Sequence, residues 1–555
     1  MTRPQPSSDD RPVLVLGPNP TPNGGMHLGH IAGPYLAGDV YARYQRARGR
    51  DVIFTTGTDD SQTYMVASAQ RLGITPEQLA RTSTQLIRDA LNAMGISVDG
   101  FGPFDETYQD TVLDFFRTLH AKGTFELRTV QLPYMARTGE FMVEGLVEGD
   151  CPVCLSSSRG GLCETCCHPN NYNELLEPHS TISADDPTDG IIMHDAQILV
   201  LPLENFREQL TAYHEAWMPY WRPHLSQMIR EVLARPLPEI PITYPLEWGM
   251  RAPFPETPGQ VLNAWLELMP AGMFTTSYAA AQLGRTTKPG ELWQVEENRR
   301  MVHFLGFDNA FFFCFPHIAL VMAHGGRYIL PEWIINNEFY ELESEKFSTS
   351  KGHVVSPQDL LDDDVPRDVV RLYLALTAPE YQRTTFSRTG LDKVGERLVG
   401  GWNRLAGTLA KAVANVGSEA ALPVSAAGRH RVAAMLERFD VFFEMPTFSL
   451  TRAADTILVH VDRLAGRAAT LDGSRSLDVG PEEWGDLFLE VKALLAAAAP
   501  ILIDLAAAAR LAGGFDGVLT TGAFDVSEVK PFTPPLLPAD ASGGPTSAGG
   551  LAGGR

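Results

Sequence analysis

Long apolar runs are missing from this chain of 555 residues. No stretch of about eighteen or more apolar residues occurs, which excludes a helical membrane span. The opening residues, 1–12, are polar and lack the apolar segment of a secretory signal. We therefore expect a cytoplasmic protein with no membrane partner.

Basic residues are also scarce. The chain has 45 Lys and Arg against 67 Asp and Glu, a net charge of −22. Nucleic-acid binding relies on clustered Lys and Arg, and so acidic a chain has no general attraction for phosphate backbones. Any contact with nucleic acid would need a local basic patch.

Cysteine is rare, with six residues, and five of them lie between positions 151 and 167. In a long chain without a secretory signal, such a cluster indicates a metal site rather than disulfides. Two C-x-x-C turns supply four thiolates, the ligand set of a structural zinc ion, with no open position for catalysis. These cysteines are Cys151, Cys154, Cys163 and Cys166. Cys167 or His168 can replace Cys166, and Cys314, in an apolar run, is expected in the core.

The N-terminal pattern predicts a doubly wound parallel sheet. An apolar run at 13–16 ends in Gly17 and leads through a Pro/Gly/Asn-rich turn into a helical pattern over about 31–48. A second strand from Asp51 ends at Gly57, before another helix. Strand, helix, strand, helix is the start of an α/β fold of Rossmann type, whose ligands bind beyond the carboxyl ends of the strands.

The rest of the chain divides by composition and periodicity. The βα rhythm breaks at 124, returns after 238, and gives way to helical segments at 391–415, 428–445, 450–470 and 483–512, which predict a terminal bundle. The expected parts are a disordered lead-in (1–11), the first half of the catalytic domain (12–123), an inserted domain with a zinc knuckle (124–238), the second half (239–345), a loop and connecting region (346–385), a helical domain (386–530) and a disordered tail (531–555).

The HLGH motif, His27-Leu28-Gly29-His30, lies where a strand turns into a helix. Glycine lets a nucleotide approach the backbone, and a helix N-terminus favours phosphate. Imidazole donors can stabilise charge that grows on phosphate oxygens. The plainer alternative is two surface histidines at the start of a helix.

Collinear motifs give the HLGH motif its context. Asn23-Gly24 and HLGH are followed by Gly57-Thr-Asp-Asp, then Tyr244-Pro-Leu-Glu-Trp-Gly, Trp265-Leu-Glu and His303-Phe-Leu-Gly-Phe-Asp. In this order the chain resembles the class I methionyl-tRNA synthetases. The resemblance implies an ATP-dependent, AMP-forming ligase that uses ATP with Mg²⁺, binds an amino acid, and carries a structural zinc knuckle.

The resemblance also implies residue roles around ATP. The catalytic residues would be His27, His30, Lys346 and Lys351. ATP would contact Asn23, Gly29, His30, Gly306, Asp308, Lys346, Ser348 and Ser350. The loop Lys346–Gly352 departs from the family pattern, because Thr349 stands at the second lysine and Lys351 lies two residues later.

For the amino acid, the resemblance implies that Asp60 receives the α-ammonium group, although an Asp-Asp pair after a strand is also typical of a helix cap. Trp265 is kept, while the other positions of the side-chain pocket read Asn19, Thr21, Asn309 and Phe313. A thioether would leave buried Asn and Thr unpaired, at roughly 1–3 kcal/mol per group. We therefore expect a polar or small amino acid.

The positions that read the anticodon in the family also differ. They read Gly400, Arg404, Gly466 and Arg467, so Arg404 is kept while an Asn and a stacking Trp are lost. Losing an aromatic platform removes roughly 1–3 kcal/mol per stacked base. Specific reading of a methionine anticodon is therefore not expected.

Three hypotheses remain. The chain passes an activated acyl group to a small-molecule or protein acceptor in specialised metabolism, as related hydrazine-forming enzymes do. Alternatively, it is a divergent methionine–tRNA ligase that charges tRNA. The third is a catalytically dead binding module, against which the retained HLGH, Asp60, Trp265 and Lys346 argue.

Overall fold

The computed structural model describes residues 10–170, 174–182, 191–343, 345–346, 354–473 and 480–538. The expected lead-in thus lies almost wholly outside the described residues. The expected start of the tail at 531 is too early, because Phe532 and Leu537 are buried. Trp402 Nε1 also donates a hydrogen bond of 2.8 Å to the Pro535 carbonyl, which fixes this segment to the bundle.

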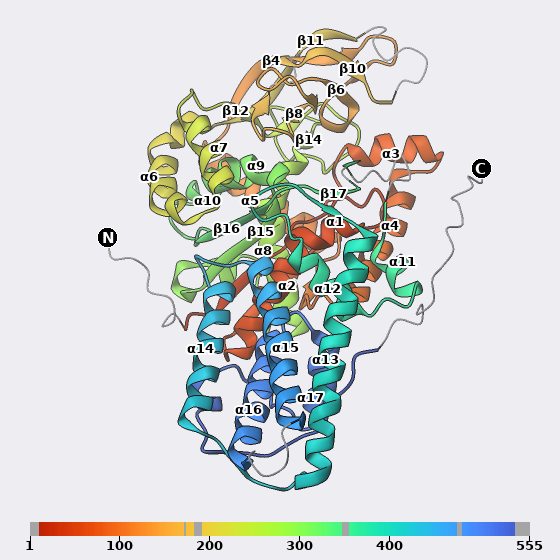
Figure 1. Cartoon of the computed structure of the whole chain (residues 1–555). Coiled ribbons are helices and arrows are strands. Elements are labelled where there is room, and N and C mark those ends of the chain that lie inside the picture. Colours follow the sequence, from red (N-terminus) through yellow and green to blue (C-terminus); the bar gives the residue numbers. More distant parts are fainter. Residues whose placement is uncertain are drawn as a thin grey trace, which may run out of the picture.

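A five-stranded parallel sheet forms the centre of the molecule (Figure 1). Its order is β16-β15-β1-β2-β3, with β1 at Val13–Leu16, β2 at Val52–Thr56, β3 at Gly100–Phe101, β15 at Arg300–Gly306 and β16 at Trp333–Asn337. In register, Leu14 pairs with Met301 on one side and Ile53 on the other. The strands are nearly all buried, as expected when helices cover both faces. The predicted α/β fold with a parallel sheet is confirmed.

Among the described residues, eight helices accompany the strands of this sheet. They are α1 (Leu28–His30), α2 (Leu36–Ala47), α3 (Tyr64–Leu72), α4 (Pro76–Ala93), α5 (Glu106–Ala121), α8 (Ala264–Gln282), α9 (Ala310–Cys314) and α10 (Pro316–Met322). Of these, α2 contacts β1, β2 and β15, while α8 contacts β2 and β3. The helical pattern expected over 31–48 is interrupted by a wide turn at Ile31–Tyr35. Pro34 lies in this turn and cannot donate a backbone hydrogen bond, which accounts for the altered pitch.

Antiparallel strands occupy the chain between the two halves of the sheet. A long antiparallel pair of strands, β4 (Glu126–Met135) and β11 (Ile191–Pro202), is flanked by β5 (Glu140–Phe141) and β12 (Glu239–Pro241). Smaller sheets join β10 (Leu176–Ser180), β6 (Val147–Asp150) and β7 (Ser157–Arg159), then β8 (Gly161–Leu162) and β9 (Pro169–Asn170), then β13 (Thr243–Tyr244) and β14 (Val261–Leu262). Helices α6 (Arg207–Trp217) and α7 (Pro223–Leu233) follow β11. Because β12 pairs with β11, the inserted domain extends to Pro241, slightly beyond the expected boundary at residue 238.

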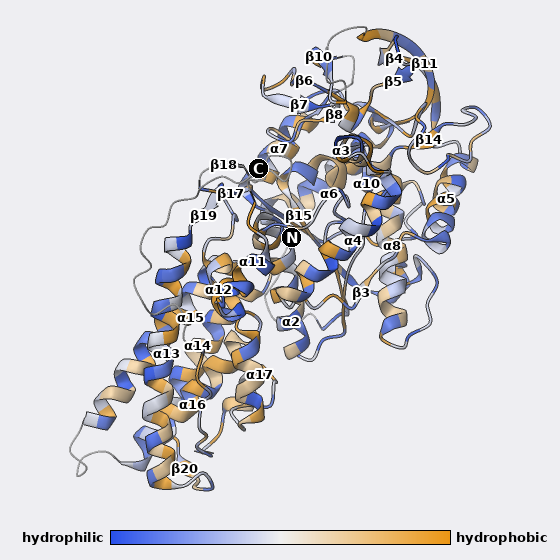
Figure 2. Cartoon of the chain, turned by 90° about the vertical axis from the view of Figure 1, so that its right-hand side faces the viewer, coloured by the Kyte–Doolittle hydropathy of each residue, from blue (hydrophilic) through white to orange (hydrophobic). Residues whose placement is uncertain are grey.

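A connecting region leads from the sheet to the C-terminal helices. It holds β17 (Tyr340–Leu342), β18 (Glu345–Lys346), α11 (Pro357–Asp362), α12 (Arg367–Leu376) and β19 (Thr384–Phe386). The bundle consists of α13 (Arg388–Val416), α14 (Ala426–Phe443), α15 (Leu450–Gly473), α16 (Pro481–Ala498) and α17 (Ile503–Leu511), with β20 (Leu422–Pro423) paired to β21 (Glu528–Val529). Figure 2 shows apolar and polar residues interleaved along these helices, as amphipathic packing requires. The helix predicted over 483–512 is wrong as a single element, because the chain breaks at Pro500.

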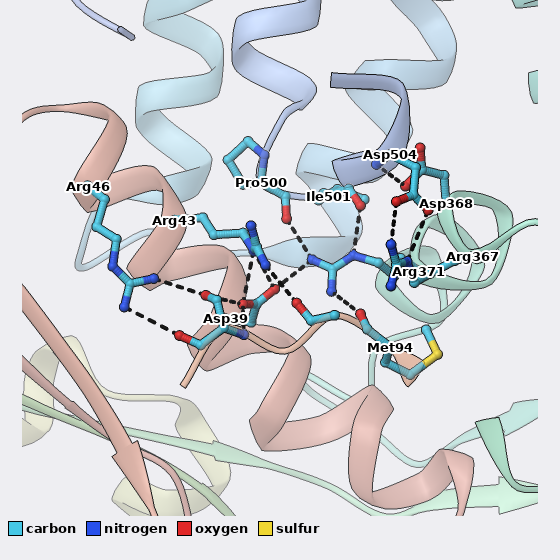
Figure 3. Close-up of polar contacts among 12 residues, drawn as sticks. Asp39, Arg43, Arg46, Met94, Arg367, Asp368, Arg371, Pro500, Ile501 and Asp504 are labelled. Atoms are coloured by element: carbon cyan, nitrogen blue, oxygen red, sulfur yellow. Dashed lines mark hydrogen bonds and ion pairs between the residues drawn. The ribbon is translucent and has the colours of Figure 1, made fainter. Parts of the chain in front are cut away.

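The bundle is joined to the sheet by a buried polar network around Arg371 of α12 (Figure 3). The guanidinium is fully buried and donates hydrogen bonds to Asp39 of α2 at 2.7 Å and to the Met94 carbonyl at 2.8 Å. It also donates to the carbonyls of Pro500 and Ile501. Burial alone would raise the pKa of Asp39, but Arg371 and Arg43 hold it below its ordinary value. The charge of Asp39 is therefore fully matched within the protein.

Candidate active site

A cavity of about 360 Å³ opens beyond the carboxyl ends of the parallel strands. This is the position at which open α/β sheets bind ligands. The predicted site residues that line it are Asn19, Thr21, Asn23, His27, Gly29, His30, Trp265, Gly306, Asp308 and Asn309. Residues from the ends of β1, β15 and β16 thus meet in one place, although they are far apart in sequence.

The HLGH motif has a defined geometry at the wall of this cavity. His27 caps α1, and its Nδ1 accepts a hydrogen bond of 3.1 Å from the Gly29 N–H. His30 Nδ1 accepts from the His27 N–H at 3.3 Å, and the two ring centroids are 3.9 Å apart. Burial lowers the pKa of His30 to about 4, so this ring is neutral at pH 7. Since Nδ1 accepts, the proton is assigned to Nε2, which leaves a neutral N–H donor for a phosphate oxygen.

Of the two adjacent aspartates, Asp59 lines the cavity and the predicted residue Asp60 does not. The backbone carbonyl of Asp60 accepts a hydrogen bond of 3.2 Å from Trp248 Nε1. Asp59 is 3% exposed, with a side-chain hydrogen bond to Gln62. Successive residues after a strand point in different directions, and the letters Asp-Asp do not say which one faces the ligand.

One wall of the cavity is formed by Trp265, whose ring stacks on Phe312 at 4.8 Å between centroids. Phe313 does not line the cavity, and its ring packs edge-on against His317 of α10. The side chains of Asn19 and Asn309 are held in place by hydrogen bonds within the protein. Asn19 Oδ1 accepts a hydrogen bond of 3.1 Å from the Gly57 N–H, and Asn309 Nδ2 donates to Asp308 Oδ1 at 2.9 Å.

The described residues on either side of the lysine-bearing loop lie at the same edge of the molecule as the cavity. Strand β18 pairs with β17, which begins at Tyr340 in the wall of the cavity, and Lys346 lies opposite Glu341. Beyond the loop, the Val355 carbonyl accepts a hydrogen bond of 2.9 Å from the Leu28 N–H of the HLGH motif. Ser348, Ser350 and Lys351 lie outside the described residues, as does the side chain of Lys346.

The four predicted zinc ligands converge. All four Sγ atoms lie within 4.8 Å of one another, with Cys154 and Cys163 at 3.6 Å and Cys151 and Cys166 at 3.8 Å. A tetrahedron with Zn–S bonds of about 2.3 Å requires sulfur–sulfur distances near 3.8 Å, so the donor set fits zinc. Cys167 is otherwise engaged, since its Sγ donates to the Phe307 carbonyl at 2.9 Å.

Two buried acidic residues near the cavity were missed from the sequence. Glu267 is fully buried and accepts a hydrogen bond of 2.8 Å from Ser61 Oγ, and burial raises its pKa to about 8. Glu144 is 2% exposed, and burial raises its pKa to about 7. Glu267 lies in the Trp265-Leu-Glu motif, so its position beside Trp265 could have indicated that it lies near the cavity. Glu144 comes from a different part of the chain and carries no such signal.

A second cavity of about 870 Å³ adjoins the first. The two share Asn23, Tyr64, Glu164 and Phe339 in their walls. Segments of the zinc-knuckle region, α3 and the β17 region surround this larger space. A second substrate of small size would have room here, next to the predicted ATP site.

The positions matched to anticodon contacts lie in the bundle. Arg404 is exposed on α13, beside Gly400. Arg467 of α15 forms an ion pair with the buried Glu490 of α16, which Arg431 and Arg463 also contact. Arg467 therefore stabilises helix packing. Within the described ranges, no helix is long and apolar enough to cross a membrane.

Residues 13–406 match the family of class I tRNA synthetases (M). Over 404 residues the chain is 34% identical to the methionine–tRNA ligase of Salinibacter ruber, covering 70% of this chain and 55% of that protein. The methionine–tRNA ligase of Flavobacterium psychrophilum is 32% identical over 372 residues, with 66% and 53% covered. The chain spans about half the length of these curated relatives.

A solved structure extends the comparison to the fold. Mycobacterium tuberculosis methionyl-tRNA synthetase in complex with methionyl-adenylate superimposes with a TM-score of 0.72 at 20% sequence identity. The match covers 96% of this chain and 99% of that one, so the bundle and the inserted strands are included. This likeness establishes a shared fold.

Proposed function

Because the chain belongs to the class I tRNA synthetases, we propose that it activates an amino acid with ATP to form an aminoacyl-adenylate. The observation that carries this proposal is the single cavity in which His27, His30, Asp59 and Trp265 meet at the ends of the parallel strands. In the reaction, the amino-acid carboxylate attacks the α-phosphorus, an acyl–phosphate bond forms, and pyrophosphate leaves.

Each residue has a role in this proposal. The Nε2–H groups of His27 and His30 donate to phosphate oxygens as negative charge grows on them. Gly306 and Asp308 contact the nucleoside, and Asp59 in place of Asp60 receives the α-ammonium group. Trp265 closes the side-chain pocket. Holding both reactants in one cavity supplies the orientation that the attack requires.

The pyrophosphate end is assigned to the lysine loop. Lys346 and Lys351 would neutralise phosphate oxygens, with Ser348 and Ser350 as donors. Mg²⁺ bound with ATP would screen the phosphate charge that the carboxylate must approach. A zinc ion on Cys151, Cys154, Cys163 and Cys166 would stabilise the knuckle without entering the chemistry.

For the acceptor we propose a small molecule or a protein. Two features support this: the adjoining cavity of about 870 Å³, and the use of Arg467 for helix packing rather than base recognition. The second candidate is charging of tRNA. It is favoured by the names of the relatives, which are methionine–tRNA ligases.

ATP–pyrophosphate exchange, measured with each standard amino acid with and without tRNA, tests both statements. We expect exchange with a polar or small amino acid to exceed exchange with methionine, and no change when tRNA is added. Arg404→Ala should leave the exchange rate unaltered. Efficient charging of methionine tRNA would establish the second candidate, and absence of exchange with every amino acid would reject activation itself.

A further inference from the structure

Cys167 directly follows the four predicted zinc ligands in sequence, but its thiol is bonded to another part of the molecule. The side chain is fully buried, and its Sγ donates a hydrogen bond of 2.9 Å to the Phe307 carbonyl. The same sulfur accepts a hydrogen bond of 3.3 Å from the Phe311 N–H. Both partners belong to the segment that joins β15 to α9. One thiol therefore links the cysteine knuckle (residues 151–167) to the parallel-sheet domain.

The backbone of Cys167 lies in the left-handed region, with a φ of 56°. A residue with a Cβ is strained in this conformation, whereas glycine adopts it freely. Strained residues of this kind persist where the surrounding structure holds them, and they are concentrated at functional sites. The strain indicates that the thiol contributes something at this position that glycine lacks.

The segment that the thiol contacts has no cap from its own side chains. Helix α9 begins at Ala310, and within the described residues the side chain of its N-cap residue, Asn309, bonds no backbone N–H of the helix. The N–H of Phe311, the second helical residue, would otherwise be one of the unpaired donors of a helix N-terminus. Cys167 Sγ supplies the missing acceptor, and a thiol can accept and donate at once. Asn309 is thereby left to donate to Asp308 Oδ1 and to line the cavity.

The turn at residues 306–309, which the thiol holds, is part of the cavity wall, and all of it except Phe307 lines the cavity. The buried Phe307 ring stacks on His224 of α7 at 3.7 Å between centroids. His224 Nδ1 lies 2.8 Å from Glu338 Oε1, and Glu338 also lines the cavity. The inserted domain therefore contacts this turn twice, through the thiol of Cys167 and through the ring of His224.

We propose that Cys167 is a positioning residue for ATP, whose thiol fixes the turn at 306–309 so that Gly306 and Asp308 meet the nucleoside. This inference rests on the proposed function, in which those two residues contact ATP. Cys167 touches no substrate itself, since it does not line the cavity. A sulfur that donates to one backbone carbonyl and accepts from one backbone N–H is also not available to a metal ion.

Calorimetric titration of the full chain with ATP and Mg²⁺, without any amino acid, tests this proposal. Cys167→Ala removes both hydrogen bonds of the thiol. We expect the Kd for ATP to rise about tenfold, because small misplacements of positioned groups have effects of that order or larger. Cys167→Ser keeps a donor and an acceptor and should restore most of the affinity. An unchanged Kd in Cys167→Ala would overturn the proposal.

Two further variants separate positioning from folding. Cys167→Gly removes the strain of the left-handed backbone, so its fold is not at risk from that source, yet it should bind ATP as weakly as Cys167→Ala. The matched control is Cys314→Ala, at a second fully buried cysteine whose Sγ forms no hydrogen bond among the described residues. This control should keep the Kd of the unmodified chain. Full ATP affinity in Cys167→Gly would show that the thiol has no positioning role.

Metal analysis and pyrophosphate exchange extend the test. Cys167→Ala should contain as much zinc as the unmodified chain, and loss of the metal would identify Cys167 as a ligand and overturn the proposal. Nucleoside contacts act equally on bound ATP and on the transition state, so the KM for ATP should rise about tenfold with kcat nearly unchanged. The KM for the amino acid should also stay nearly unchanged. A lower kcat with an unaltered KM for ATP would contradict the assignment.

Failure of this inference can be told apart from failure of the proposed function. Equal ATP affinity in the unmodified chain and in Cys167→Ala rejects the positioning role and retains activation. Weaker ATP binding by Cys167→Ala, together with no exchange by the unmodified chain for any amino acid, retains the positioning role and rejects activation.

Discussion

Buried acidic residues have opposite surroundings in the bundle and at the candidate active-site cavity. In the bundle, Glu490 is fully buried and contacts three arginines, and at the junction Arg371 is fully buried against Asp39. Behind the cavity, Asp59 and Glu267 are equally buried and have no cationic partner among the described residues. In the bundle the buried carboxylates are matched by arginines, whereas burial without a cationic partner raises the pKa of Asp59 and of Glu267 and favours their protonated forms.

The cysteine knuckle is a third case, in which the partner is proposed to be a metal ion. Metal analysis should find about one zinc per chain, and chelation should unfold the 124–241 region, because structural zinc sites contribute roughly 10 kcal/mol or more in small domains. Circular dichroism and limited proteolysis would follow the loss. Cys163→Ser should reproduce it, and Cys314→Ser, in the core outside the cluster, should keep the metal. Freshly purified, reduced protein without metal would refute the assignment.

Breaking the junction tests the structural side of the comparison. Arg371→Met should lower the free energy of unfolding by about 3–5 kcal/mol, because Asp39 is left buried with its charge only partly matched. Denaturant titration would measure this. The control is Arg397→Met on an exposed pair with Asp462, which should cost at most about 1 kcal/mol. Similar losses for the two variants would remove the distinction between buried and surface charges here.

Removing a cavity donor tests the functional side. His30→Ala should lower the rate of adenylate formation by two to three orders of magnitude, about 2.7–4 kcal/mol, the scale for one positioned charge-stabilising donor. Amino-acid binding and thermal stability should be nearly unchanged. If this variant instead loses binding and keeps its turnover number, the histidine positions substrate and does not stabilise the transition state.

Local sequence patterns predicted the main secondary-structure elements and motifs of this molecule, but not the directions in which its side chains point. The parallel sheet, the HLGH turn and the cysteine spacing are encoded over short stretches, so strand and turn signals were sufficient. Whether Asp59 or Asp60 faces the cavity, and whether Phe313 does, depends on which way these side chains point after tertiary packing. Pro500 was a local signal for the break between α16 and α17, and it was overlooked.

Contacts between residues far apart in the sequence could not be predicted from local patterns at all. Arg467 aligned with a position of nucleic-acid contact, and only its ion pair with Glu490 shows that it packs helices. Glu144 joins the buried acidic residues near the cavity from the strand-rich insertion, which has no periodic relation to the sheet. Such groups become visible only when the chain is folded.

The pH dependence of stability separates matched from unmatched carboxyls most finely. Burial raises the pKa of Glu267 to about 8 and that of Glu144 to about 7, both above the ordinary value for Glu. The folded state therefore holds these protons more tightly than the unfolded chain, and the resulting stability is lost as pH rises through the folded pKa. Between pH 6 and pH 9, the Glu267 shift alone corresponds to a loss of roughly 2–3 kcal/mol in the ligand-free protein. Thermal or denaturant unfolding at both pH values would measure it, and Glu267→Gln should flatten the profile, whereas Glu296→Gln, at an exposed position, should retain it. An unchanged slope in Glu267→Gln would mean that its charge is already matched, as that of Glu490 is, and the contrast between the cavity and the bundle would fail at this residue.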